Sequence, residues 1–356
     1  MLYHIAGYIA ESFGPGRLLQ SHAVLIGISL FLGFFTVCLF LPKFYKYLPR
    51  DRGREFTVHA EEAKGKPTGS GIVFITIFII VSLFCAPLNI QQSIILLLTW
   101  LIMLTGYLDD RSTTSWGELR KGLLDLIISI IAAFILYYFN SNFLQNGEVT
   151  MWFPFVTHTI VVSPWIFIIL ATIILWVSIN TTNCTDGVDG LSSTLVLVAL
   201  VTVGGLFYFI LGHKHFSEYL LVPHLTDGAS WAVIVFALIG VLIGYLWHNA
   251  FPSKVLMGDA GSRALGFFMG VCVIVSGNPF LLIATSTVIF INGGLGLLKV
   301  ALLRFCKIKI FTNVRFPLHD HMKKKKGWSA TQVLVKFVII QFLFTIATLA
   351  ILLKIR

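Results

Sequence analysis

The sequence predicts an all-α integral membrane protein with about ten transmembrane helices, forming a single polytopic domain over residues 1–356. Hydrophobic residues make up 57% of the 356 residues and charged residues only 12%, about half the charged fraction of a typical soluble domain. The apolar residues also gather in repeated uncharged stretches that approach the ~20 residues of a membrane-spanning helix. Composition and segment length together exclude an ordinary soluble globular protein.

Ten apolar runs follow one another along the chain, with polar loops between them. The eighth run is short for a membrane span and could instead be re-entrant. We keep it as a span, because without it the most basic loop would face outward. The predicted runs are Ala23–Leu41, Gly71–Pro87, Ser93–Leu108, Gly122–Phe139, Pro164–Ile179, Leu191–Leu211, Trp231–Trp247, Ala264–Val275, Pro279–Leu303 and Val333–Leu353.

The basic residues predict the orientation. The loops after runs one, three, seven and nine hold most of the 26 lysines and arginines, including Lys254 and Arg263 after run seven, whereas the alternate loops contribute only Lys214. Basic loops stay in the cytoplasm, so we expect odd-numbered loops inside and both termini outside. In a membrane protein the placement of the basic residues matters more than their sum, so the net charge of +10 does not favour nucleic acid as a partner. The N-terminus lacks the pattern of a cleaved signal peptide.

The stretch Asn180–Leu191 is the most informative polar segment. Asp186 and Asp189 are three residues apart and each precedes a glycine, while Asn183 precedes Asp186 by three. Glycine lets the backbone approach a ligand closely. Helix capping by Asn and Asp is the alternative explanation. With Asn180 there are two Asn and two Asp within ten residues, and this density beside a membrane helix favours a ligand site.

Two further acidic clusters are predicted to lie on the same cytoplasmic face. Asp109 and Asp110 end run three, and their side chains diverge by about 100° on a helix. Asp259 stands between two glycines just before run eight, where the N–H groups of a helix N-terminus favour phosphate. A carboxylate at that point suits Mg²⁺, which binds one or two carboxylates plus substrate phosphate oxygens. Capping remains the alternative for Asp259.

The loop after run nine adds His319-Asp320-His321 and then four lysines, Lys323 to Lys326. No cysteine accompanies the histidines, so a zinc site is not compelling. A phosphate-facing histidine suits an anionic substrate, and the lysine run suits contact with an anionic lipid surface. Together these clusters predict a cytoplasmic Mg²⁺ site for phosphoryl transfer to or from a lipid phosphate.

These motifs resemble the polyprenyl-phosphate N-acetylhexosamine-1-phosphate transferase superfamily in order and spacing over almost the whole chain. The most specific motif is Asn183-x-x-Asp186-Gly-x-Asp189-Gly-Leu191. Pro317-Leu318-His319 and Lys326-Gly327-Trp328-Ser329 look like the phospho-N-acetylmuramoyl-pentapeptide transferase branch. The resemblance implies a bacterial cytoplasmic-membrane enzyme, often dimeric. Its substrates would be UDP-MurNAc-pentapeptide and undecaprenyl phosphate, its products lipid I and UMP, and its cofactor Mg²⁺.

The resemblance also implies residue roles. Asp259 and Asp109 would hold the metal, and Asp109, Asp110, Asp259 and His319 would be catalytic. The substrate-binding residues implied by similarity are Lys66, Lys121, Asn183, Asp186, Gly187, Asp189, Asn249 and His321.

The chain departs from the family at three places. The family's triple histidine is His319-Asp320-His321 here. The family's Gly-Thr-Pro-Thr-Met-Gly-Gly segment appears as Gly65-Lys66-Pro67-Thr68-Gly69-Ser70-Gly71. Leu256 stands where Phe is usual. Two alternatives follow from the sequence. One is a UDP-GlcNAc:undecaprenyl-phosphate GlcNAc-1-phosphate transferase for surface polymers. The other is a secondary transporter, whose binding charges would lie near the bilayer midplane.

Overall fold

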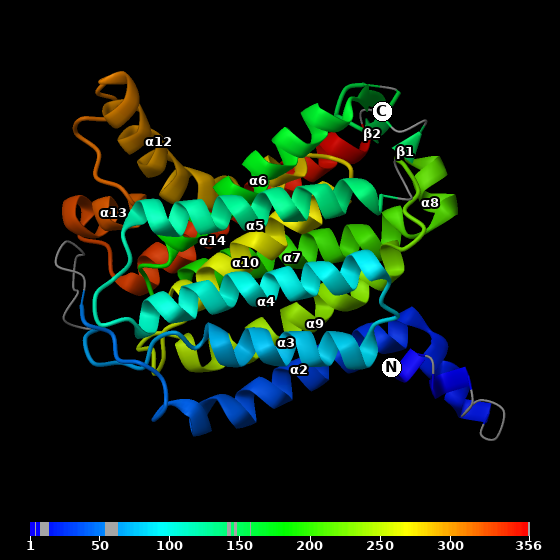
Figure 1. Ribbon diagram of the computed structural model, residues 1–356, viewed down its shortest axis with the longest axis horizontal. Helices are drawn as coiled ribbons and strands as arrows, with labels where there is room; N and C mark the ends of the chain where they lie inside the picture. Colours follow the sequence, from blue (N-terminus) through cyan, green and yellow to red (C-terminus); the bar gives the residue numbers. More distant parts are fainter. Residues whose placement is uncertain are drawn as a thin grey trace.

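The computed structural model describes residues 1–3, 5–7, 14–53, 63–140, 144–145, 148–156 and 158–354. It is a bundle of long helices (Figure 1). In chain order these are α2 (His22–Phe44), α3 (Gly71–Cys85), α4 (Ile90–Arg111), α5 (Glu118–Tyr138), α6 (Pro164–Thr185), α7 (Leu191–Gly205) with η3 (Leu206–Leu211), α9 (Gly228–Asn249), α10 (Gly258–Val275), α11 (Leu281–Ile289) with η4 (Phe290–Gly294), α12 (Leu295–Ala301) with η5 (Leu302–Cys306), and α14 (Ala330–Lys354). Three short helices, η1 (Gly14–Gln20), α8 (Lys214–Tyr219) and α13 (Leu318–Lys326), lie between or before them.

Each of the ten predicted apolar runs falls on helix, so the all-α membrane class is confirmed. In the described part of the chain, eight helical segments are long and apolar enough to cross a membrane. The other two runs correspond to α3, which is shorter, and to α5, whose first turns carry charged residues. The number of spans, ten, stays a prediction that this arrangement fits.

The short eighth run is the central helix of the bundle. It begins at Gly258, earlier than the predicted Ala264, and every residue of α10 is buried. It packs against α4 and α6, and its small residues allow close contact: a Cβ on Gly266 would lie 2.5 Å from the backbone oxygen of Ser178 in α6. A helix enclosed by other helices does not need a long lipid-facing apolar surface, which explains why its apolar run is short.

The sequence did not predict a small antiparallel sheet, nor the short helices η1, α8 and α13. The sheet consists of β1 (Leu144–Gln145), β2 (Glu148–Met151) and β3 (Ile160–Val162), with Val149 of β2 paired to both outer strands. The indole N–H of Trp152 donates to the carbonyl of Ser276, just beyond α10, over 2.8 Å. The sheet thus covers one end of the bundle.

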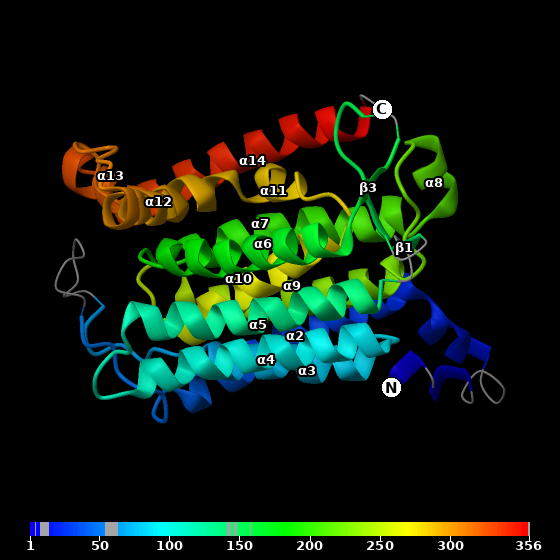
Figure 2. The ribbon, with the colours of Figure 1, turned by 45° about the horizontal axis from the view of Figure 1, so that its top comes forward.

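Both termini lie at the sheet end of the bundle, whereas α13 and the last turn of α4 lie at the opposite end (Figures 1 and 2). The predicted site residues therefore share the end away from the termini. This separation agrees with the predicted orientation, in which the termini are outside and the site loops are inside.

Candidate active site

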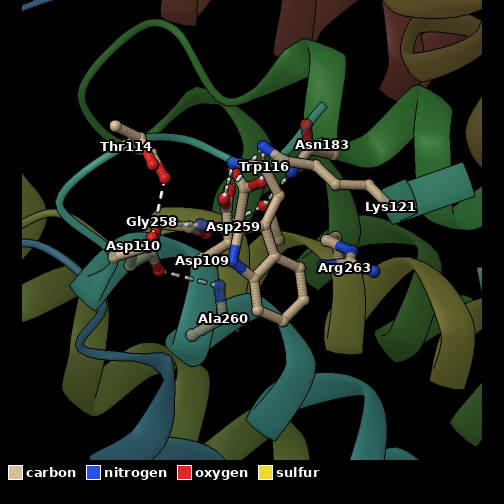
Figure 3. Close-up of polar contacts among 12 residues, drawn as sticks. Asp109, Asp110, Thr114, Trp116, Lys121, Asn183, Gly258, Asp259, Ala260 and Arg263 are labelled. Carbon is tan, nitrogen blue, oxygen red and sulfur yellow. Dashed lines mark hydrogen bonds and ion pairs between the residues drawn. The ribbon is translucent and has the colours of Figure 1, made fainter. Parts of the chain in front are cut away.

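Three helices bring one charge each to a single point at the end of the bundle. Asp109 stands in the last turn of α4, Lys121 in the first turn of α5 and Asp259 in the first turn of α10. The Lys121 ammonium forms ion pairs with the carboxylates of both Asp109 and Asp259, the latter over 2.9 Å (Figure 3). The two aspartates are only 7% and 6% exposed, so each carboxylate needs such a partner to remain charged.

The second oxygen of Asp109 organises the loop that joins α4 to α5. It accepts a hydrogen bond from the backbone N–H of Trp116 over 2.6 Å. The guanidinium of Arg120 lies 3.8 Å from the centre of the Trp116 ring. Asp109 is therefore fixed by both helices that flank the loop and by the loop itself.

Asp110 points away from its neighbour, as the helical spacing predicted, and holds the start of α10. Its two carboxylate oxygens accept the backbone N–H groups of Asp259 and Ala260, over 3.1 and 3.0 Å. First-turn N–H groups have no acceptor within their own helix, and a carboxylate there also suits the helix dipole. Gly258 makes this contact possible: its φ is +67°, and a Cβ would lie 2.3 Å from an Asp110 oxygen. This geometry indicates that Asp110 positions Asp259.

The Asn180–Leu191 segment contacts this group of helices through Asn183. The Asn183 side-chain amide donates to the hydroxyl of Ser262 over 3.1 Å, and that hydroxyl donates to the carbonyl of Gly258 over 2.9 Å. Asp186 directly follows α6, and its N–H donates to the carbonyl of Asn183. The first half of the motif therefore lies against the N-terminal turn that carries Asp259.

The second half of the motif forms a neighbouring cluster with two other loops. Asp189 accepts the backbone N–H of Ser253 over 2.9 Å and lies 3.7 Å from the ammonium of Lys66, which donates to the Ser253 hydroxyl. Asn249 is buried, accepts the N–H of Gly190 and donates to the carbonyl of Val255. Lys66, Asp189 and Asn249 thus join the loops before α3, after α6 and after α9.

The two histidines of α13 do not converge. His319 is buried, and its backbone N–H donates to the side-chain oxygen of Asn292 over 2.8 Å. Its ring lies against Gly187, where a Cβ would stand 2.4 Å from the ring Nε2. His321 instead accepts the backbone N–H of Arg315 at Nδ1. Asp320, the departure from the triple histidine, is buried with one oxygen 3.8 Å from the His319 Nε2.

One buried ion pair next to the site was not predicted. The apolar-run pattern places Arg263 in a loop, but it lies within α10, 2% exposed, with its guanidinium paired to Asp125 of α5. Asp125 is four residues beyond Lys121, and Arg263 is four beyond Asp259. This shared four-residue spacing, with the charges in opposite order on the two helices, is the sequence pattern that could have predicted the ion pair.

The central carboxylates suit a hard divalent cation. Among the residues that the structure describes, no three His, Cys, Asp or Glu side chains gather as a metal cage. Mg²⁺ does not need one, since one or two carboxylates and substrate phosphates suffice. Asp109 and Asp259 already converge on a cationic group, the Lys121 ammonium. Their geometry and donor chemistry therefore fit the predicted ion.

The fold and this site define a polytopic membrane transferase, and the chain belongs to glycosyl transferase family 4, whose profile matches residues 93–277. It is 53% identical over 352 residues to a phospho-N-acetylmuramoyl-pentapeptide-transferase of Treponema pallidum (strain Nichols), covering 99% of this chain and 96% of the relative. Proteins of that name from Campylobacter hominis and Helicobacter pylori are 31% and 30% identical, covering 94% and 91% of this chain and 95% and 92% of theirs. The chain is thus a phosphotransferase enzyme, and the transporter alternative is set aside.

Proposed function

We propose that this enzyme transfers phospho-MurNAc-pentapeptide from UDP-MurNAc-pentapeptide to undecaprenyl phosphate, giving lipid I and UMP at the cytoplasmic face of a bacterial inner membrane. The observation that carries the proposal is the convergence of Asp109, Lys121 and Asp259 from three helices at one end of the bundle. The similarity to named relatives over nearly the whole chain supports the choice of donor and acceptor.

The reaction exchanges one phosphoric anhydride for another. An oxygen of the lipid phosphate forms a bond to the β-phosphorus of the donor. The bond from that phosphorus to the bridging oxygen breaks, and the bridging oxygen leaves with UMP. Negative charge concentrates on the phosphates throughout, so catalysis depends on positioning and charge stabilisation.

In this proposal Asp259 and Asp109 hold Mg²⁺. The ion, when bound, neutralises charge on the diphosphate and polarises its phosphoryl oxygens. Lys121 lies between the same carboxylates and supplies a second positive charge beside the phosphates. Asp110 keeps the N-terminal turn of α10 in place through the N–H groups of Asp259 and Ala260. The start of α10 then presents its dipole to the phosphates.

The remaining predicted residues surround this centre. Asn183 lies in the last turn of α6, and Asp186 and Gly187 directly follow that helix. We assign all three to the nucleotide and diphosphate end of the donor. Lys66, Asp189 and Asn249 form the adjacent cluster and would bind the same end. His319, against Gly187, would face the phosphates as a donor. His321 is a less direct candidate, because it faces Arg315 instead.

The test follows UMP release by detergent-solubilised protein with Mg²⁺ and undecaprenyl phosphate. UDP-MurNAc-pentapeptide and UDP-GlcNAc are supplied in parallel. We expect turnover only with the first donor, and loss of turnover when EDTA removes the metal. Turnover only with UDP-GlcNAc would move the protein to the surface-polymer branch. Activity that is indifferent to EDTA would refute the role of the metal.

A further inference from the structure

A basic pocket lies beside the active site, between α12 and α13. It has a volume of about 570 Å³ and is formed with the segment that joins η5 to α13. Lys299, Arg315, Lys324 and Lys325 line it together with His321, and none of its lining residues in the described chain is acidic. Four permanent positive charges around one cavity, only one of them beside a carboxylate among the residues that the structure describes (Arg315, near Asp320), favour an anion there.

The walls of this basic pocket are held by their own contacts. The Lys299 ammonium donates to the carbonyls of Phe311 and Val314, each over 2.9 Å. The Arg315 backbone N–H donates to His321, and its guanidinium lies 3.9 Å from the buried carboxylate of Asp320. Lysine and arginine groups that are already oriented lose less entropy when they bind an anion.

The basic pocket is separate from the catalytic centre, although the two share α13. His319 and Lys323 stand four residues apart on this helix and both contact Gly187, Lys323 through the Gly187 carbonyl over 3.4 Å. His321, Lys324 and Lys325 instead line the pocket. One helix thus offers one face to the proposed substrate loop and another to the pocket.

The surroundings of the pocket indicate that the anionic group belongs to a lipid. α12 and η5 expose large apolar side chains, among them Leu298, Leu303 and Phe305, the last 81% exposed. Leu298 directly precedes the pocket residue Lys299. In a membrane protein such a surface faces lipid chains, so the pocket lies where an apolar surface meets positive charge.

We propose that the basic pocket binds the phosphate of an anionic membrane lipid headgroup, while the apolar surface of α12 and η5 contacts its acyl chains. This site is distinct from the Asp109, Lys121 and Asp259 centre and does not depend on the proposed reaction. Its occupant would tie α13, and with it His319, to the bilayer surface.

The test measures thermal stability of the whole protein in a neutral detergent during titration with dioctanoyl phosphatidylglycerol. Dioctanoyl phosphatidylcholine and inorganic phosphate serve as comparison ligands. We expect the phosphatidylglycerol alone to raise the Tm of the wild-type protein. Lys324→Gln with Lys325→Gln should shift the midpoint of this titration to roughly 30-fold higher lipid concentration, since each basic residue near a lipid surface contributes about a factor of five.

A matched variant, Lys309→Gln with Lys326→Gln, removes the same charge from exposed residues that do not line the pocket. It should titrate like the wild type. Equal weakening of lipid binding in both variants would show that general surface charge causes the effect, and it would overturn the proposed site. An equal Tm rise with inorganic phosphate at the same concentration would overturn the lipid assignment. Because the readout is binding, failure of the proposed reaction leaves these outcomes unaffected.

Discussion

At the scale of single residues, the central feature is an imbalance of charge. Two buried carboxylates, Asp109 and Asp259, share one ammonium, that of Lys121. With all three groups ionised, the cluster keeps a net negative charge in a place that water reaches poorly, which is unfavourable. A divalent cation at this point would offset that negative charge and leave a positive charge for the substrate phosphates, and this is the residue-level reason for the proposed Mg²⁺ site.

Asp259→Asn tests this assignment. The amide keeps the size of the side chain but removes the charge that would bind the metal, so UMP release should fall by roughly 100-fold or more. Size-exclusion profile and Tm should remain close to wild type. Glu218→Gln, at an exposed carboxylate in α8, is the matched control and should keep full activity. Near-normal turnover in Asp259→Asn would remove Asp259 from the metal site.

Gly187→Ala tests the placement of His319. The new methyl group would stand 2.4 Å from the His319 Nε2, and this ring is buried and held by Asn292, so the ring or the loop must move. Displacement of about 1 Å can lower catalysis as much as 100-fold, and we expect at least a 10-fold loss in kcat.

The matched control for that substitution is Gly205→Ala at the end of α7, where an added Cβ meets nothing within 4 Å. It should keep activity and gain a little stability, since alanine favours helix. Equal kcat values for the two alanine variants would show that His319 does not need its present position.

At the scale of elements, α5 and α10 are joined by two ionic contacts one helical turn apart. Lys121 pairs with Asp259, and Asp125 pairs with Arg263, so the signs are reversed between the two. The outer contact belongs to the candidate active site. The inner one is almost fully buried and fixes the rotation of both helices about their axes, which places Lys121 against Asp259.

Removing one partner of the inner pair should lower folding stability more than removing both partners. Arg263→Met leaves Asp125 buried without its ion-pair partner, and the expected loss is about 3–5 kcal/mol of folding stability. Asp125→Leu combined with Arg263→Met replaces the pair with apolar side chains and should restore most of the Tm.

The double-mutant cycle is read in both Tm and UMP release. If the inner pair positions Lys121, then kcat should fall in the single variant and recover in part in the double variant. Additive losses in Tm would contradict the coupling of the two residues.

At the scale of the whole molecule, the termini and the sheet lie at one end of the bundle, and α13 lies at the other (Figure 2). An enzyme that transfers a phospho-sugar from a water-soluble nucleotide sugar to a membrane lipid needs its site at a bilayer surface, and the end position of Asp109 and Asp259 in their helices meets this need. The basic pocket at the same end extends the contact to the lipid surface.

Reporter fusions test the orientation. Alkaline phosphatase fused after Arg356 should be active, because that terminus is predicted to be outside. Green fluorescent protein fused after Lys309 should fluoresce, because the basic loop is predicted to be inside. Exchange of the two reporters should silence both. A fluorescent fusion at the C-terminus would invert the proposed topology and the side on which the substrate binds.

The sequence alone determined the class of the protein and its candidate residues. Apolar run length reports directly on membrane helices, because a bilayer imposes a fixed length on every span. Asp109, Asp110, Asp259 and the Asn183 motif were identifiable because charged and amide groups at the ends of apolar runs have few roles besides capping and function. Even the Asp125–Arg263 pair had a signal in its spacing.

Only the tertiary structure decided which of those residues meet. Helices α4, α5 and α10 bring together residues up to 150 positions apart, and no local pattern encodes that distance. Packing places Asp109 beside Lys121 but Asp110 at the start of α10. It also gives His319 and His321 different contacts. It also made the shortest apolar run the central helix. Local sequence specifies each helix and its polar ends, whereas contacts between distant helices are fixed only by how their surfaces fit in three dimensions.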